Sequence, residues 1–528
     1  MRQNCPEHEH RGRATVQAWL IALIGPIALI FSQTFPLHAQ TLTQQSIAQQ
    51  VEQLSAAMAR TESQVEESQR QLEIMRRQLA TLQARMGLPG ADATDSASES
   101  NAANAASNLA AQVDALREQQ GVQESQIATQ DQAKVESESK YPVKVSGLIL
   151  LNGFVNTQKV DIAATPTIAA GGPGSTGLSL WQTVLGLDAR GPSLFGARSF
   201  ADVRVDFDGG SYASTNSTGG YNGSLGMLRL RTAHATMEWQ HTQAFFSLDR
   251  PIFSPYTPSS LTAIAIPALA WSGNLWSWNP QVGATHDFSL SSSLRLRAQT
   301  ALIDVSDAPA VAGGVAPSVT AANLPADNTI SSPSAAEQSR WPGVESRLAL
   351  LGVEENAAQL GIGGYFAPHR ILNGTRFDAW AGTLDYRQPL PARLELTASA
   401  YRGQSLGGLG GGGFKDYAYY FDGHDTYFRA LDDMGGWAQL KERASERLEF
   451  NAAFGIDNVP AGQLRPYASP YSTPYQNLAR NRTFGGNVIY SPSAYLLFSL
   501  EYRRLDSSPV NSPANGSNVI GVGAGYKF

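Results

Sequence analysis

The last eleven residues, Asn518–Phe528, constrain the fold of this chain more than any other stretch. Apolar side chains recur there at every second residue: Ile520, Val522, Ala524, Tyr526 and Phe528. A β-strand places alternate side chains on opposite faces, so the segment predicts a strand whose apolar face ends in two aromatic rings. The edge strand of a soluble sheet can show the same pattern. Other parts of the chain must therefore indicate what covers that apolar face.

A leader with the properties of a secretory signal peptide opens the sequence. Its apolar run, Val16 to Phe31, follows a basic segment and precedes a small-residue cleavage site that ends at Ala39. We therefore interpret residues 1–39 as a signal peptide. A retained membrane anchor is the alternative, although a Gly-Pro pair interrupts the run, which is short for a full span. The single cysteine, Cys5, lies in this leader, so the secreted chain would hold no disulfide and no cysteine metal ligand.

A heptad pattern occupies residues 41–88. The seam follows a spacing of four and three residues, and its only polar members are Thr61 and Ser68. Its apolar members are Ile47, Val51, Leu54, Met58, Val65, Leu72, Met75, Leu79, Leu82 and Met86. Such a repeat makes a left-handed coiled coil, so this helix needs partner helices, although the seam does not fix their number. Residues 89–140 follow as a flexible linker with a weaker second helical pattern.

The remainder, residues 141–528, consists of alternating segments separated by turn-forming residues, and we count sixteen of them. The links between segments alternate between short and longer along the chain. The longest are residues 249–280, 305–343 and 403–433. No apolar run after the leader is long enough for a membrane-spanning helix, and an open sheet in lipid would leave backbone groups unpaired. The pattern predicts an all-β transmembrane barrel of about sixteen antiparallel strands, preceded by an N-terminal α-helical coiled coil.

The two faces of the predicted strands differ in character. Around residue 204, for example, Val203 and Val205 would face lipid while the charged residues beside them face the lumen. A lumen bounded by sixteen strands is too wide for side chains to fill, so we expect water inside. Residues 249–280 form an unusually apolar loop. We expect it to narrow the lumen, the alternative being that it latches a neighbouring subunit or packs on the rim.

Five arginines on neighbouring strands are expected to point inward and to form a basic wall: Arg204, Arg229, Arg231, Arg295 and Arg297. The candidate acidic residues of the pore are Asp202, Asp206 and Asp249. A guanidinium binds carboxylate or phosphate through two parallel hydrogen bonds, so such a wall would favour anions. The alternative is that these arginines pair with wall aspartates as struts and have no role in selectivity.

The organisation of the whole chain resembles the DcaP-like trimeric porins of bacterial outer membranes. The barrel opens on YPVKVSGLILLNGFV, continues through LDRPIFSPYTP and WNPQVGATHDF, and closes on GYKF. The resemblance implies a homotrimer of barrels in the cell outer membrane, a periplasmic coiled coil, and passive diffusion of small hydrophilic, preferably anionic, solutes. It also implies contact with outer-membrane lipid and lipopolysaccharide. The barrel assembly machinery is a further expected partner, with Tyr526 and Phe528 as the barrel-closing C-terminal signal.

Two other functions are compatible with parts of the sequence. The coiled coil could tether the barrel to peptidoglycan, with transport secondary. An outer-membrane enzyme is disfavoured because no histidine has the spacing of a nucleophile or metal site. The run Gly407–Gly413 lacks the Lys and Ser/Thr of a phosphate loop, so we interpret it as a flexible extracellular tip. We expect no cofactor and no metal, and the net charge of −6 argues against nucleic acid as a partner.

Overall fold

The computed structural model describes residues 143–209, 227–306, 308, 311–314, 333–354, 357–371, 374–421, 424, 426–468 and 475–528. The predicted signal peptide, coiled coil and linker lie outside these residues. Within the described ranges, no helix is both long enough and apolar enough to cross a membrane.

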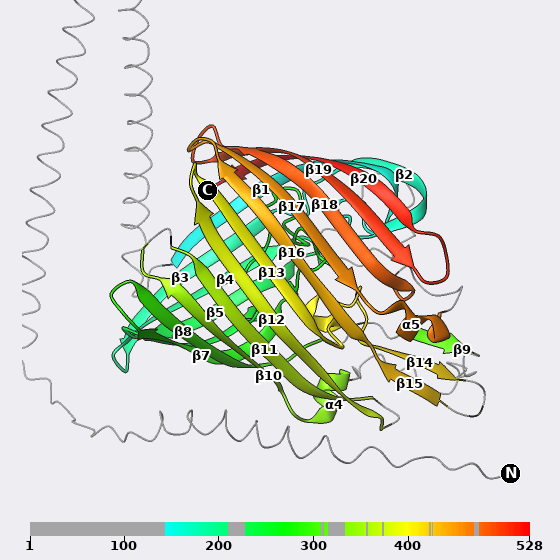
Figure 1. Cartoon of the computed structure of the whole chain (residues 1–528). Helices are drawn as coiled ribbons and strands as arrows, with labels where there is room; N and C mark the ends of the chain where they lie inside the picture. Colours follow the sequence, from blue (N-terminus) through cyan, green and yellow to red (C-terminus); the bar gives the residue numbers. More distant parts are fainter. Residues whose placement is uncertain are drawn as a thin grey trace, which may run out of the picture. The chain divides into compact units, whose positions relative to one another are not determined.

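The described residues form a closed antiparallel barrel (Figure 1). The strands of its first half are β1 (Val143–Val160), β2 (Ala169–Ser179), β3 (Val184–Leu194), β4 (Ala197–Asp206), β5 (Arg229–Glu238), β6 (Thr242–Asp249), β7 (Asn279–Ser289) and β8 (Leu294–Ile303). Those of the second half are β10 (Gly343–Gly352), β11 (Gln359–Arg370), β12 (Arg376–Leu390), β13 (Leu394–Gln404), β16 (Asp432–Arg443), β17 (Leu448–Asn458), β18 (Leu478–Tyr490), β19 (Leu496–Pro509) and β20 (Asn515–Lys527). Apart from β2 and β3, which both pair with β1, each strand pairs with the next in this order, and β20 closes the ring on β1.

Two of these strands share one position in the wall. The first half of β1 pairs with β3 and its second half pairs with β2, and residues 180–183 form a break between them. The hydroxyl of Thr183 accepts a hydrogen bond from the backbone N–H of Leu150 at 3.1 Å, so the ladder stays satisfied across the break. The seventeen strands of this sheet therefore fill sixteen positions.

The prediction of a closed, sixteen-strand antiparallel barrel is confirmed. Each of the sixteen alternating segments becomes a strand of the wall, within a few residues of its expected bounds. The strand β2 was not predicted, because AAGGPGSTGLS is rich in glycine and serine and has little apolar alternation. The predicted short links join β3 to β4, β5 to β6, β7 to β8, β10 to β11, β12 to β13, β16 to β17 and β18 to β19.

The longer links carry small elements of their own. A second, three-stranded sheet contains β9 (Val311–Gly314), β14 (Tyr417–Phe421) and β15 (Thr426–Ala430). The short helices are α4 (Ala335–Ser339), η3 (Gly407–Leu409), α5 (Ala461–Leu464) and η4 (Arg465–Tyr467). All of these lie in the longer links, which join strands at the end of the barrel opposite the short turns.

The outer face of the barrel is apolar and exposed. Large hydrophobic side chains on strands all around the ring are between about two-fifths and three-fifths exposed, for example Ile149, Leu348, Ile362, Phe454, Leu500 and Val522. Tyr526 and Phe528 face outward too, and Phe528 exchanges two backbone hydrogen bonds with Gly147 of β1 at 3.0 and 3.1 Å. The apolar face of the last strand is thus part of a continuous apolar exterior.

Candidate functional site

A long loop between β6 and β7, residues 250–278, lies inside the barrel and is called the inner loop below. Its backbone is held by inward side chains of distant strands. The N–H of Ile252 donates to Glu345 on β10 at 2.8 Å, and the N–H of Ser259 donates to Gln439 on β16 at 2.7 Å. The amide of Asn487 on β18 donates back to the carbonyl of Ser259 at 2.8 Å. The loop therefore crosses the lumen, as the constriction hypothesis predicts.

The inner loop also reaches the break between β2 and β3. The side-chain amide of Gln182 donates to the carbonyl of Thr262 at 2.9 Å, and its oxygen accepts from Ile264 and Ala265 at 2.7 and 3.0 Å. Gln182 is 1% exposed, so its side chain satisfies three backbone groups of the inner loop at a buried position.

Glycines allow the inner loop to lie directly on the opposite wall. Gly273 has a φ of +97°, and a Cβ there would stand 2.2 Å from the carbonyl oxygen of Gly436 on β16. A Cβ on Gly455 of β17 would stand 2.1 Å from the carbonyl oxygen of Ser272. Backbone meets backbone at these positions, which only glycine permits.

The glycine-rich segment, residues 405–416, is a second piece of chain inside the barrel, and its prediction as a flexible extracellular tip is wrong. Leu406 and Leu409 are fully buried, and they pack in one cluster with Phe253 and Leu275 of the inner loop. The backbone N–H of Trp276 donates to the carbonyl of Leu409 at 3.1 Å. The glycines serve close packing rather than mobility, since a Cβ on Gly410, which has a φ of +96°, would lie 2.7 Å from the Trp276 ring.

Buried charges fix the glycine-rich segment to the wall. The N–H groups of Gly412 and Gly413 donate to Asp433 on β16 and Asp457 on β17 at 2.5 and 3.0 Å. The ammonium of Lys415 donates to the carbonyl of Gly412 at 2.7 Å. Burial lowers the pKa of Lys415 to about 8, against the opposing attraction of Asp457 and Asp433. The segment is therefore held by specific polar contacts as well as by apolar packing.

These two segments bury one side of the lumen and leave the other accessible. On the second half of the barrel, the side chains of Arg347 and Asp385 are 5% and 0% exposed, while Arg387 and Glu395, nearer the short turns, are 29% and 19% exposed. On β3 to β8, Asp206 is fully buried, but Asp188 and Arg297 keep access to solvent at 39% and 38% exposed. The open part of the lumen therefore runs along β3 to β8.

Four of the five predicted arginines pair with aspartates in this open part. Arg204 contacts Asp188 at 2.5 Å, and Arg229 holds Asp206 through two bonds of 3.0 and 2.7 Å. Arg295 and Arg297 both bind Asp287. Each of these guanidiniums is at least partly neutralised by its neighbour, as the strut alternative requires.

Arg231 differs from the other four. Its Nη1 is buried and has no hydrogen-bond partner, and the same holds for Nη1 of Arg250, at the start of the inner loop. The Trp278 ring lies 5.0 Å from the Arg231 guanidinium and 5.1 Å from that of Arg229. Burial lowers the pKa of Arg250, although Asp249 opposes this. Two desolvated cations, one of them beside an aromatic ring, therefore present donors that lack an acceptor.

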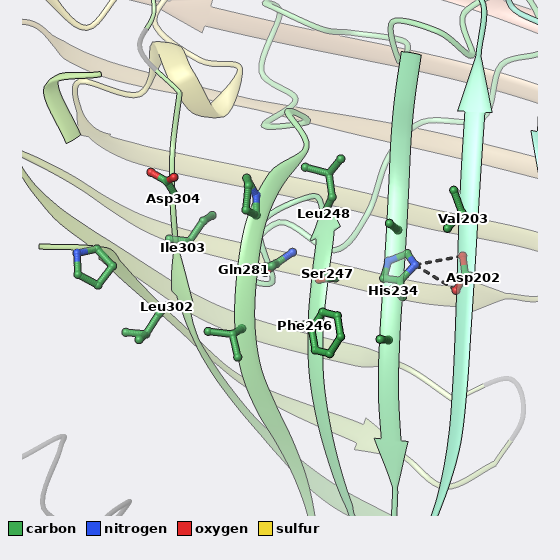
Figure 2. Close-up of a pocket in the computed structure, with 15 residues that line it drawn as sticks. Asp202, Val203, His234, Phe246, Ser247, Leu248, Gln281, Leu302, Ile303 and Asp304 are labelled. Atoms are coloured by element: carbon green, nitrogen blue, oxygen red, sulfur yellow. Dashed lines mark hydrogen bonds and ion pairs between the residues drawn. The ribbon is translucent and has the colours of Figure 1, made fainter. Parts of the chain in front are cut away.

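His234 on β5 joins two of the predicted acidic residues. Its Nδ1 lies 3.1 Å from Asp202 and its Nε2 lies 3.0 Å from Asp249, and Figure 2 shows the ring turned toward Asp202 on the neighbouring strand. Carboxylates only accept hydrogen bonds, so both ring nitrogens must carry a proton for both contacts to be hydrogen bonds. The third acidic candidate, Asp206, is fully buried against Arg229.

Sequence reasoning missed several residues of this site. Arg250 and Trp278 flank the apolar loop, and the only available signal was their position next to predicted strand ends. Gln182 lies in a break that the alternating pattern did not show. Lys415 lies two residues after the glycine run Gly407–Gly413, and a large aromatic and a charged residue directly after the run were a weak sign that it has a fixed position.

No family model and no curated protein matches this sequence. Among solved structures, the outer membrane channel DcaP of Acinetobacter baumannii aligns with 74% of this chain and 99% of its own, with a TM-score of 0.53 and 16% identity. An anion-selective porin from Comamonas acidovorans aligns over 74% of this chain and 100% of its own, with a TM-score of 0.45 and 9% identity. OmpT of Vibrio cholerae covers 74% and 98%, with a TM-score of 0.41 and 9% identity. The described part of this chain therefore has the barrel fold of the DcaP channel.

Proposed function

We propose that this chain is an outer-membrane porin through which small anionic solutes diffuse. The observation that carries the proposal is the reversal of polarity across a closed wall. Leu500 and Val522 on the outside are exposed, while Glu501 and Asn481 face inward. An apolar exterior around a ring with no free strand edge suits hydrocarbon, and a polar interior suits water.

The path for solutes runs along β3 to β8, beside the inner loop. This part of the wall carries the solvent-accessible charges, including Arg297, Asp249 and Asp202. The inner loop and the glycine-rich segment close the remainder of the cross-section with apolar packing. A narrow, charge-lined passage discriminates solutes by size and sign, whereas an open sixteen-strand barrel would pass them with little selection.

Anion preference is supported most directly by Arg231 and Arg250. The Nη1 group of each has no hydrogen-bond partner, and the Arg231 guanidinium lies beside Trp278. An incoming carboxylate or phosphate would supply the acceptors that these donors lack. The four paired arginines contribute less, because each shares its charge with Asp188, Asp206 or Asp287.

Planar-bilayer recording tests both the porin function and this division of roles. The folded protein should show stepwise openings and a reversal potential that favours anions. Replacing Arg231 and Arg250 together by Gln should move the reversal potential toward zero, because two desolvated positive charges leave the passage. Replacing Arg295 and Arg297 by Gln should have a smaller effect, since Asp287 already offsets them.

Arg402→Gln is the matched control, because Arg402 faces outward and should leave selectivity unchanged. An anion preference that survives in the Arg231/Arg250 variant would remove the selectivity role of these residues. Folded protein without any openings would contradict the porin function itself.

We further propose that the barrel associates into a homotrimer, with the N-terminal heptads forming a periplasmic coiled coil. An apolar groove of about 610 Å³ over β4 to β8 supports a subunit contact there, and it is lined by the outward side chains of Val203, Phe246, Val282 and Leu302. Figure 2 labels three of them, with Phe246 central among the strands. A contiguous exposed apolar surface of this kind commonly marks a site at which another subunit packs.

Deleting Thr41–Lys140 separates the porin from the tether alternative. The truncated barrel should keep its single-channel conductance, because every strand of the described wall pairs with other described strands. Association with isolated peptidoglycan should fall only if the segment acts as a tether, and pull-down of both proteins on cell-wall sacculi measures it. Loss of conductance from a folded truncated barrel would show that the segment is part of the pore.

A further inference from the structure

Among the residues that the structure describes, His234 is the one histidine in the open part of the lumen along β3 to β8. The side chains of His234, Asp202 and Asp249 are 27%, 21% and 35% exposed, so water reaches all three. The other described histidines are His241 in a short turn, His286 on the outer face beside the exposed Phe288, and His369 and His424 near the long links.

Both ring nitrogens of His234 face carboxylates. Nδ1 lies 3.1 and 3.2 Å from the two oxygens of Asp202 on β4, and Nε2 lies 3.0 Å from Oδ2 of Asp249 at the end of β6. Figure 2 marks the contacts between His234 and Asp202 across the two neighbouring strands. A neutral imidazole carries one N–H, and an ionised carboxylate carries none. Only the doubly protonated, positively charged ring therefore makes both contacts attractive.

The two carboxylates differ in how firmly the fold holds them. Asp202 is the cross-strand neighbour of His234 in the β4–β5 ladder, and Nη1 of Arg204 lies 3.7 Å from its Oδ2. Asp249 is the last residue of β6 and stands directly before the inner loop. Loss of one ring proton would leave Nδ1–H on the two oxygens of Asp202 and turn the lone pair of Nε2 toward Asp249. The contact with Asp249 would then be repulsive.

The charged groups around His234 and Asp249 come from β4, β5, β6, the inner loop and β10. They are Asp202, Arg204, Arg231, Asp249, Arg250 and Glu345, and Asp188 on β3 lies one strand farther, against Arg204. β7 contributes the uncharged Gln281. Arg231 and Arg250 both interact electrostatically with Asp249. The charge on His234 therefore offsets Asp249 at the point where anions are expected to bind.

We propose that His234 makes the anion selectivity of the passage depend on pH. While the ring carries both protons, it holds one positive charge and neutralises Asp249. When it loses a proton, Asp249 loses its nearest counter-charge and faces the passage as a carboxylate beside Arg231 and Arg250. The local charge falls by one unit, so anions are attracted less strongly. This inference rests on the proposed porin function and names the residue that regulates its selectivity.

Histidine is the side chain whose charge ordinarily changes near neutral pH, which makes His234 the first candidate for such a response. Lys415 is a second group inside the barrel that titrates in this range, since burial lowers its pKa to about 8. It lies in the glycine-rich segment on the sealed side of the lumen, with its ammonium on the carbonyl of Gly412. The test must therefore separate a response of His234 from one of Lys415.

The reversal potential of the purified full-length protein in planar bilayers, measured across a salt gradient from about pH 5 to about pH 9, tests the proposal. For the wild type, the anion-to-cation permeability ratio should be high at acid pH and fall several-fold in a single one-proton step. His234→Gln removes the titrating group, so the ratio should stay at the alkaline value of the wild type throughout. His234→Arg carries a permanent charge and should keep the ratio near the acid value at every pH.

His286→Gln is the matched control, because it makes the same change on the outer face of the barrel and should leave the step unchanged. A second measurement needs no variant. Nitrogen NMR of the wild-type protein with labelled histidine should show one ring with both nitrogens protonated, and that ring should lose a proton over the same pH range as the selectivity step.

Three results would contradict these expectations in distinguishable ways. A step that persists in the folded His234→Gln variant would assign the pH dependence to another group, such as Lys415 or Glu345, and would overturn the proposal. An anion preference that stays constant over the whole pH range would also overturn it, while the porin function would stand. An absence of anion preference at every pH would contradict the proposed function as well.

Discussion

Gly410→Val is expected to raise the single-channel conductance several-fold. Gly410 has a φ of +96°, where a valine is strained, and its Cβ would lie 2.7 Å from the ring and 3.0 Å from the backbone nitrogen of Trp276. The substitution should therefore push the glycine-rich segment away from the inner loop and open the part of the lumen that both segments fill. Planar-bilayer recording measures the change directly.

A second substitution in the same segment strengthens the test. A Cβ on Gly408 would lie 2.0 Å from the carbonyl oxygen of Ser306, so Gly408→Val should act in the same direction. Gly462→Val is the matched control, because nothing lies within 4 Å of the Cβ position at Gly462. Both lumen variants should also lose anion selectivity, since a wider passage keeps solutes farther from Arg231 and Arg250. Wild-type conductance from both folded variants would show that the segment does not limit the pore.

The wall of the barrel could be predicted from the sequence because its rules are local. Alternation with a period of two sets the faces, as in Val203 and Arg204, and the charge pattern fixes which face is inward. Link lengths then separate the two rims. The strand β2 escaped prediction because its side chains are too small to show the alternation, and its place depends on β1, which pairs with two strands in succession.

The contents of the lumen could not be predicted, because they depend on contacts between residues far apart in sequence. Gly407–Gly413 has the composition of a flexible tip, and its burial follows from Leu406, Leu409 and Trp276 closing on one another across more than a hundred residues. The pairing state of the arginines was equally hidden. The alternation shows which arginine side chains point into the lumen. It does not show whether a guanidinium pairs with an aspartate, as Arg204 does, or lacks an acceptor for Nη1, as Arg231 does, because this depends on the register of neighbouring strands.

The buried pair Arg347 and Asp385 connects β10 and β12 beneath the inner loop, and breaking it should have the largest effect on stability of any single substitution in the wall. The two side chains form two hydrogen bonds of 2.8 and 2.6 Å and are at most 5% exposed. Asp385→Ala would leave a buried guanidinium with Gln299 and Tyr256 as neutral partners and no counter-charge. We expect the free energy of unfolding to fall by about 3–5 kcal/mol. Urea titration of the protein in detergent, followed by tryptophan fluorescence, measures it.

Two controls separate the cost of an unpaired charge from the loss of the pair as such. The double variant Arg347→Met with Asp385→Leu removes both charges, and it should lose far less stability than Asp385→Ala, because no buried charge is left without a partner. Glu238→Ala breaks the Arg198–Glu238 pair, whose side chains are 80% and 43% exposed, and should cost no more than about 1 kcal/mol. If Asp385→Ala and the double variant lost equal stability, the pair itself would be the stabilising element. An unpaired Arg347 would then cost nothing extra, which means that water reaches it beneath the inner loop. The division of the lumen into a sealed side and an open side along β3 to β8 would then be wrong.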